Sequence, residues 1–220
     1  MSQRSVSLAE NEPYHIYNRG TDKRTIYVDQ ADYKRFVELL YLSNSTQSFV
    51  VRDIYRAQEE IFEHDRGNPL VAIGAYCLMP NHFHILLHQL VDEGISKFMN
   101  KLGTSYAMYF NKKYNRTGAL FQGKFKAKHA TTDEYLKYLY AYIHLNPVKL
   151  TDSTWKEEGI KDAAKSFDFA ASFQYSSLLD YLGSVRKEGK ILDPRLFPEY
   201  FVTPQDIKNE MFTWLEYKEI

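Results

Sequence analysis

The sequence predicts an α+β fold, a ferredoxin-like split β-α-β sandwich with an antiparallel sheet, followed by a mostly helical C-terminal extension. Between His15 and His129, strand and helix patterns follow the order strand, helix, strand, strand, helix, strand. Pro80-Asn81 separates the two middle strands, which is typical of an antiparallel pair. Residues 151–220 are acidic and mixed in pattern. We therefore expect two parts, a domain over residues 1–150 and an extension over residues 151–220.

Local patterns predict the elements of the first half. His15–Tyr17 is a short aromatic and β-branched run, which is typical of a strand. Residues 29–43 repeat apolar side chains at spacings of three and four and predict a helix, and residues 52–63 predict a second one. Residues 70–79 are almost continuously apolar, as in a buried central strand, and residues 82–89 form its antiparallel partner.

The second half begins with a long predicted helix. Residues 94–113 carry an apolar face at helical spacing, and residues 120–129 form a loop that leads into a strand. The Thr-x-x-Glu pattern at Thr131–Glu134 is a capping box. It predicts a helix that runs to Asn146, where Pro147 stops it.

Composition excludes several classes of protein. The chain has 220 residues, with 28 Lys+Arg and 28 Asp+Glu, so its net charge gives no global attraction to a polyanion. One cysteine excludes an internal disulfide and a multi-cysteine zinc site. No segment reaches the roughly 20 apolar residues of a membrane span. Residues 1–13 lack the apolar core of a signal peptide. We expect a soluble, cytoplasmic protein with no membrane partner.

Charge is unevenly distributed along this neutral chain. Residues 94–132 contain no acidic residue but eight basic ones. They are Lys97, Lys101, Lys112, Lys113, Arg116, Lys124, Lys126 and Lys128. A local positive field of this kind attracts nucleic acid, and we interpret the eight residues as candidate DNA contacts. A solvated helix face followed by a basic loop would give the same pattern.

Two histidines share one face of a predicted strand. Side chains alternate along a strand, so His82 and His84 project to the same side and Phe83 to the other. Imidazoles about 6–7 Å apart on a strand can share one divalent ion. The alternative is that both are polar residues on a half-exposed strand, with no metal.

The predicted helix after residue 132 carries several tyrosines. Tyr142 and Asn146 stand four residues apart, on one helix face. A phenol and a carboxamide placed this way could meet a metal-bound phosphate together. Tyr138 lies four residues before Tyr142, so spacing alone does not select one tyrosine, and packing of both rings is the alternative.

Together these features are suited to one reaction, the cleavage of a phosphodiester bond. A divalent metal polarises a phosphate, a deprotonated phenol attacks phosphorus, and basic and aromatic side chains hold a single strand. A metal-holding pair, a tyrosine-bearing helix and a basic segment are therefore the parts needed to cut a phosphodiester through a covalent tyrosine.

Four sequence blocks carry a resemblance to a known family. Residues 75–87, AYCLMPNHFHILL, resemble the MPNHxH block of the single-tyrosine HUH transposases, within them the insertion-sequence-200-like and palindrome-associated group. Residues 142–149, YIHLNPVK, resemble the YIHLNPV block of that family. Residues 14–20, YHIYNRG, resemble its opening strand and loop, and residues 118–125, GALFQGKF, resemble the segment before its last strand. The order of the blocks is more specific than any one of them.

The resemblance implies a role for individual residues. His82 and His84 would bind a divalent metal, Mg²⁺ or Mn²⁺, with Asn146 assisting, and Tyr142 would be the nucleophile. Arg19 becomes a candidate DNA contact. The activity implied is transposition: cleavage and rejoining of single-stranded or hairpin DNA through a 5′-phosphotyrosine that frees a 3′-OH.

Two other functions are alternatives to an active single-tyrosine transposase. Tyr138 and Tyr142 together suggest a two-tyrosine HUH nuclease of the replication or relaxase type, but the match around Asn146-Pro147 favours a single tyrosine. A domesticated hairpin-binding protein without catalysis is the second alternative. Such a binder needs neither the histidine pair nor Tyr142. The sequence leaves open whether the protein is a monomer or a homodimer.

Overall fold

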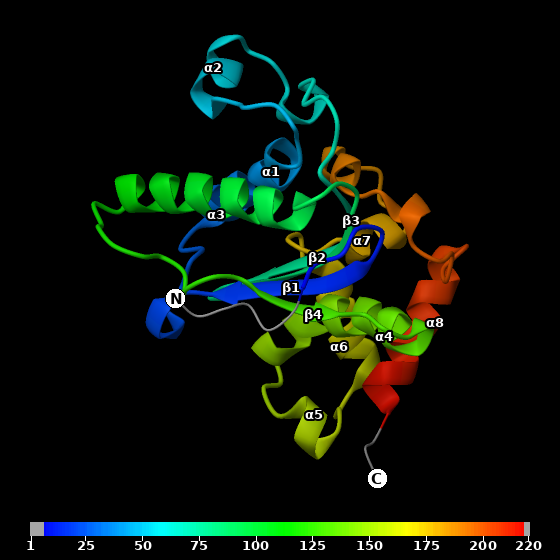
Figure 1. Cartoon of the computed structure of the whole chain (residues 1–220). Coiled ribbons are helices and arrows are strands. Elements are labelled where there is room, and N and C mark those ends of the chain that lie inside the picture. The colour runs from blue at the N-terminus through cyan, green and yellow to red at the C-terminus, as the bar shows by residue number, and fades with distance from the viewer. Residues whose placement is uncertain (1–6, 218–220) are drawn as a thin grey trace.

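The computed structural model describes residues 7–217 and confirms the predicted α+β sandwich (Figure 1). Four strands form one antiparallel sheet in the order β2-β3-β1-β4. They are β1 (Pro13–Arg19), β2 (Val71–Met79), β3 (His82–Gln89) and β4 (Lys126–His129). This order places the opening strand, β1, directly beside β3, although nearly 70 residues separate their facing partners Tyr17 and His84 in the sequence.

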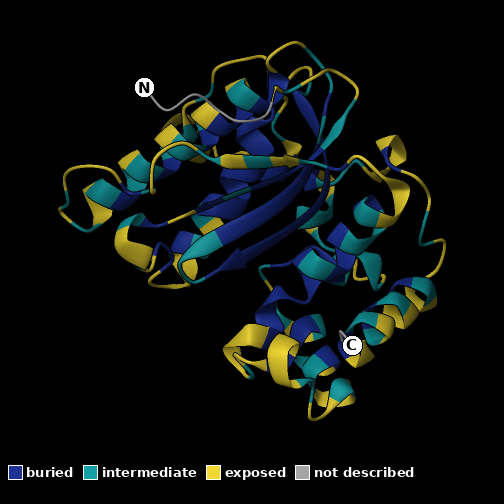
Figure 2. Ribbon diagram, turned by 60° about the horizontal axis from the view of Figure 1, so that its bottom comes forward, coloured by how far each residue is buried: buried dark blue, intermediate teal, exposed yellow. Residues whose placement is uncertain are grey.

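Helices cover both faces of the sheet. In Figure 1, α1 (Gln30–Ser43) and α3 (Gly94–Lys113) lie on one side, and α4 (Asp133–His144) lies on the other. β2, β3 and most of β1 are buried between these layers, whereas β4 at the other edge is partly exposed (Figure 2). Phe83 and Ile85 pack into the core with α1 and α3, whereas Leu86 packs into the core with α4, as strand alternation requires.

The C-terminal residues are largely helical, as predicted. They form short 3₁₀ turns and four helices: η3 (Asn146–Leu150), α5 (Trp155–Glu158), α6 (Ala163–Ser172), α7 (Leu178–Tyr181), η4 (Lys187–Ile191), η5 (Pro194–Leu196) and α8 (Pro204–Glu216). Ala141 and Leu145 share a buried cluster with Phe167 and Met211. The extension is thus packed against α4, and the division of the chain at residue 150 stays a prediction.

The position of β2 differs from the sequence prediction. The apolar run forms a strand at one edge of the sheet, not at its centre. It is nevertheless buried along its whole length. The extension covers the edge: Leu78 N–H donates to the carbonyl of Tyr175, and the carbonyl of Ile73 accepts from Asp193 N–H. A continuous apolar pattern records burial on both faces and carries no information about strand order.

Two predicted helix boundaries are wrong. The predicted helix over residues 52–63 is divided into α2 (Val51–Arg56) and η2 (Ile61–Glu63), because Gln58 has a φ of 55° in the left-handed region. The helix predicted to reach Asn146 ends at His144 and continues as η3. Its cap is the Thr132 hydroxyl, which accepts from Tyr135 N–H, and the predicted capping box does not form.

Asp32 joins α1 to the end of α3. This buried carboxylate accepts from Lys113 Nζ at 2.7 Å, from the Tyr114 hydroxyl at 2.7 Å and from the Tyr109 hydroxyl at 3.1 Å. Burial raises the pKa of Asp32, but the hydrogen bonds from Lys113 and Tyr114 outweigh it and hold the pKa below its ordinary value of 3.8. Lys113 therefore contributes to the stability of the fold.

The variant Lys113→Met should lower the free energy of unfolding by about 2–3 kcal/mol, because it leaves the Asp32 carboxylate buried without its cation. Thermal unfolding measures the loss, with the exposed neighbour Lys112→Met as control. A carboxylate with a depressed pKa stabilises the fold above its unfolded pKa, so the difference should be present at neutral pH and shrink as the pH falls below about 3.8. Equal melting temperatures for the two variants would contradict this role.

None of the helices formed by residues 7–217 is long and apolar enough to cross a membrane.

Candidate active site

Three histidines from β1 and β3 meet on the sheet face that α4 covers. The rings of His82 and His84 have centroids 5.0 Å apart, so the strand places the two side chains on one face, as alternation predicts. His15 lies beside them on β1, with its Nε2 2.8 Å from Nδ1 of His84.

His15 is not among the residues that the sequence singles out. Its contact with His84 depends on the pairing of β1 with β3, where Tyr17 faces His84. The split β-α-β order predicts that pairing, and alternation puts His15 and Tyr17 on the same face. The predicted topology therefore indicates that His15 lies near the β3 histidines, but it does not predict the register between the two strands.

The histidine face is more buried than the sequence suggests. The alternative to a metal pair is a half-exposed strand, but α4 covers this face and leaves His84 only 6% exposed. Burial is the main cause that lowers the pKa of His82 to about 4, and the positive charge of Lys149 is the second. Burial, followed by His15, lowers the pKa of His84 well below its ordinary value. Both imidazoles are therefore neutral at physiological pH, the form that binds metals.

Tyr142 is the tyrosine of α4 that faces the histidines. Its ring centroid lies 5.3 Å from that of His84 and 5.5 Å from that of His15. Tyr138 lies one turn away and packs on Trp214 at 4.5 Å. Tyr140 is buried on another side of the helix, where it packs with Phe197 among other aromatic rings. Burial raises the pKa of the Tyr142 phenol, so the hydroxyl is protonated at neutral pH.

Asn146 offers an oxygen beside the histidine pair. Its Nδ2 donates to the carbonyl of Tyr142 at 2.6 Å, which fixes the orientation of the amide. Its Oδ1 is buried and finds no hydrogen-bond partner within the described part of the chain. The same side chain lies against His82, where it partly offsets the lowering of the histidine pKa. A buried carbonyl oxygen without a donor is a suitable ligand for a cation.

The hydrogen bonds of the histidines leave one ring nitrogen of each for such a cation. Nδ1 of His82 donates to Oδ1 of Asn81 at 2.6 Å, which leaves the Nε2 lone pair available. If Nδ1 of His84 donates to His15, Nε2 of His84 is available in the same way. Within residues 7–217, no three His, Cys, Asp or Glu side chains form a metal-binding group. The two imidazoles and the Asn146 amide are therefore the candidate donors for a divalent ion, and their role as ligands stays a prediction.

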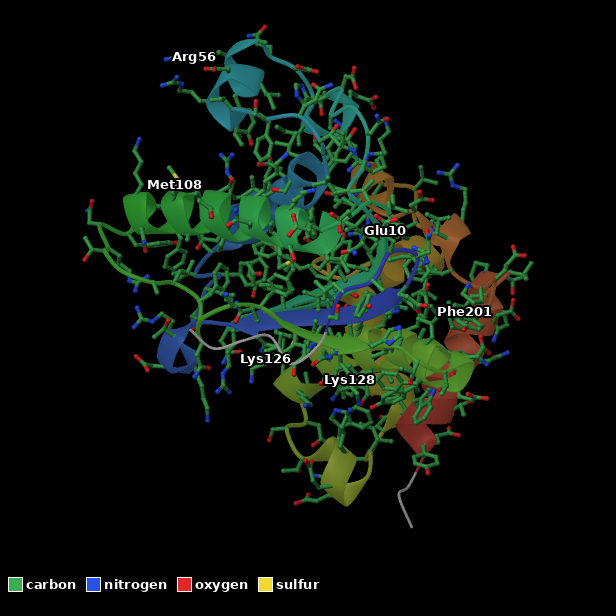
Figure 3. The ribbon with its side chains drawn as sticks, viewed as in Figure 1. Glu10, Arg56, Met108, Lys126, Lys128 and Phe201 are labelled. Atoms are coloured by element: carbon green, nitrogen blue, oxygen red, sulfur yellow. The ribbon has the colours of Figure 1, made fainter. Side chains whose placement is uncertain are left out.

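Basic side chains from several elements surround this group. Lys126 and Lys128 alternate with Ala127 and His129 along β4, and they pair opposite Tyr17 and His15. Both are exposed and project toward the α4 side of the sheet in Figure 3. Arg19 lies close enough to lower the pKa of His82, and Lys149 and Lys156 both lower that of His84. Lys149 and Lys156 are not among the basic residues predicted from the sequence to contact DNA.

The remaining predicted DNA contacts lie elsewhere. Lys97, Lys101, Lys112 and Lys113 belong to α3, on the opposite face of the sheet. Lys101 Nζ donates to the carbonyls of Ser45 and Gln47, and Arg116 donates to Asn111. Lys124 lines a hollow on the α3 side. A role of these residues in DNA binding stays a prediction.

Two hollows adjoin the histidines and Tyr142. The first, of about 370 Å³, is here called the cationic hollow; its walls include Tyr17, Arg19, Lys23, Asn81, His82 and Lys126. The second, of about 410 Å³, is called the aromatic hollow; its walls include Tyr138, Tyr142, Trp155, Lys156, Trp214 and Tyr217. A larger hollow of about 730 Å³ in the extension contains neither the histidines nor Tyr142. The site is therefore flanked by one basic and one aromatic recess.

Comparison with known proteins identifies the family. Residues 15–146, more than half of the chain, match the family described as "Transposase IS200 like". The chain belongs to the IS200-like transposase family. The matched residues of this transposase include His15, His82, His84, Tyr142 and Asn146.

A solved structure has the same fold. It is described as a "REP associates tyrosine transposase bound to a REP hairpin", with 13% sequence identity and a TM-score of 0.52. The similarity covers 86% of this chain and 90% of that one. No curated protein matches the chain. The family assignment confirms the resemblance seen in the sequence, and the solved structure confirms the fold.

Proposed function

We propose that this IS200-like transposase cleaves and rejoins single-stranded DNA at a hairpin through a covalent bond between Tyr142 and a 5′ phosphate. One observation carries the proposal. The ring of Tyr142 packs against His84, while the unpartnered Oδ1 of Asn146 lies at the adjoining His82. The proposed nucleophile and the proposed cation ligands thus lie next to each other.

The donor set defines the metal-binding part of the proposal. His82, His84 and Asn146 would hold Mg²⁺ or Mn²⁺. When bound, the ion polarises the scissile phosphate and stabilises its developing negative charge. His15 positions His84 through their hydrogen bond, and Asn81 positions His82.

The proposed reaction is an exchange of one ester for another. The Tyr142 phenol loses its proton to solvent, and its oxygen attacks the phosphorus. A bond from the phenolic oxygen to phosphorus forms as the bond from phosphorus to the 3′ oxygen breaks. The 3′ oxygen takes up a proton, and the 5′ end remains attached to the tyrosine. Attack by a 3′-OH on the phosphotyrosine reverses these steps and rejoins the strand without ATP.

The proposed DNA surface consists of basic residues around the site, namely Arg19, Lys126, Lys128, Lys149 and Lys156. Arg19 is held by Gln122, to which its Nε donates. Lys128 Nζ lies 4.3 Å from the ring centroid of Tyr135. This arrangement of charges and rings suits contact with phosphates and unstacked bases. The solved relative is bound to a hairpin, and we propose hairpin DNA as the ligand of this chain as well.

A strand-cleavage assay tests the function. The substrate is a DNA hairpin with single-stranded flanks, labelled at its 5′ end, incubated with the protein and Mg²⁺ or Mn²⁺ or with EDTA. A set of hairpins with varied flanks samples different cut-site sequences. Metal-dependent cleavage with a free 3′-OH on the labelled fragment supports the proposal. Binding without cleavage under every condition would instead favour the non-catalytic hairpin binder.

The salt dependence of binding tests the DNA surface. Each phosphate contact on a single strand contributes about −0.7 to the slope of log K against log salt. The double variant Lys128→Ala/Lys149→Ala should therefore reduce the slope by about 1.4 in fluorescence anisotropy titrations. The pair Lys97→Ala/Lys112→Ala on α3 tests the contacts predicted from the sequence on the other face, and if DNA binds only around the histidine site its slope should equal that of the unmodified protein. A reduced slope for the α3 pair alone would place the DNA on the other face.

A further inference from the structure

We infer that the aromatic hollow is a binding site for one unstacked nucleobase next to the scissile phosphate, and that residues outside the family match supply half of its lining. This inference rests on the proposed function, because it assumes a single-stranded DNA ligand at Tyr142. Trp155, Lys156, Trp214 and Tyr217 all lie beyond residue 146, where the family match ends. The site would therefore be formed jointly by α4 and the C-terminal extension.

The walls of the hollow are chiefly aromatic. Tyr138 and Tyr142 come from α4, Trp155 from the start of α5 and Trp214 from α8. The hollow of about 410 Å³ has the size of a small-ligand site. Base stacking on aromatic side chains requires a ring face and tolerates any base. These walls favour a flat, unsaturated ring over a phosphate or an aliphatic group.

The main stacking candidate, Trp214, is held in place before any ligand binds. Its indole Nε1 donates to Oε1 of Glu210 at 2.8 Å, and Oε2 of Glu210 pairs with Lys137 of α4 at 2.9 Å. The ring also packs against Tyr138, with centroids 4.5 Å apart. Trp214 is nevertheless only partly buried. Tyr217 also contacts the ring, with centroids 5.4 Å apart. A ring that is already fixed and still partly exposed binds a partner at little cost in conformational entropy.

The position of the hollow indicates which nucleotide would bind there, namely one next to the cleaved phosphodiester. Tyr142 is a wall of the hollow and also contacts His84. Lys156 Nζ lies 4.4 Å from the ring centroid of Tyr142 and 5.4 Å from that of Trp155. A cation at this place can contact a phosphate while the attached base enters the hollow. The occupant is therefore a base close to the phosphate that Tyr142 attacks.

Tryptophan fluorescence provides a direct test. The chain contains two tryptophans, Trp155 and Trp214, and both line the aromatic hollow, so all indole emission reports on this site. The probes are an oligothymidine and an abasic oligonucleotide of equal length and charge, titrated in EDTA so that no strand is cut. We expect the oligothymidine to quench the emission and the abasic strand to bind with little quenching.

Two variants of Trp214 refine the test. Trp214→Leu should weaken oligothymidine binding by about 5- to 100-fold, the loss of one stacked base, and leave binding of the abasic strand unchanged. Trp214→Phe keeps a ring and should retain most of the affinity, with Trp155 as the remaining reporter. Thermal unfolding checks that both variants fold. The quenching experiment on the unmodified protein tests the base site even if a variant does not fold.

Three outcomes would contradict the proposal that the aromatic hollow binds a base. Equal quenching by both strands would assign the hollow to the sugar-phosphate chain. A concentration-dependent change in emission without DNA would assign it to a second copy of the protein. Binding of oligothymidine with no quenching would leave the hollow empty. Metal-dependent cleavage together with any of these would sustain the proposed function, whereas base-dependent quenching without cleavage would sustain the base site alone.

Discussion

Replacing Tyr142 with phenylalanine should abolish covalent strand cleavage, a loss of about 1,000-fold or more, because the attacking oxygen is removed. The ring and its contacts with His84 and Lys156 remain, so DNA affinity and thermal stability should be unchanged. A gel assay on a labelled hairpin measures cleavage, and fluorescence anisotropy measures binding to the same DNA.

Tyr138→Phe is the matched control for this experiment. Tyr138 lies on the same helix, one turn earlier, but packs against Trp214 and not against the histidines. Its variant should cut the hairpin at a rate close to that of the unmodified protein. Loss of cleavage in Tyr138→Phe as well would favour the two-tyrosine mechanism that the sequence leaves open.

The double variant His82→Ala/His84→Ala should lose metal binding and metal-dependent cleavage together. Two of the three proposed ligands are absent, so the affinity for Mn²⁺ should fall by more than about 100-fold, and cleavage by at least as much. Calorimetric titration with Mn²⁺ measures the first effect independently of catalysis. Undiminished Mn²⁺ affinity in a folded variant would contradict the assignment of His82 and His84 as metal ligands.

The burial of His84 makes a stability control necessary. His84 packs against His15 and Tyr142, so its removal should itself cost about 1–3 kcal/mol of folding free energy. His88→Ala is the matched control, since it removes the same side chain from the same face of β3, farther along the strand. This variant should bind Mn²⁺ like the unmodified protein.

Much of the fold could be predicted from periodicity. The bounds of β3 and α3 agree with the patterns of residues 82–89 and 94–113, because β3 is buried on both faces and α3 buries one face. The position of β2 at the edge could not be predicted, since its cover comes from residues 175 and 193, far along the chain. The left-handed Gln58 that divides α2 from η2 likewise has no clear local signal.

The candidate site shows the same division between local and distant information. Alternation places His82 and His84 on one face, and helix spacing places Tyr142 near Asn146, so these positions follow from local rules. The contact of His15 with His84 depends on the register between two strands. The proximity of Lys156 and Trp214 to the tyrosines depends on how the extension folds back onto α4. The spacing of residues within one segment cannot predict such contacts between distant segments.

The central claim is that Tyr142 becomes bonded to DNA, and mass spectrometry of a trapped adduct tests it most directly. A hairpin substrate with a nick placed so that the leaving strand diffuses away prevents rejoining and traps the covalent intermediate. After proteolysis, we expect a nucleotide phosphate on the peptide at Tyr142, formed only with Mg²⁺ or Mn²⁺ present. An adduct on Tyr138, or strand cleavage without any adduct, would contradict it.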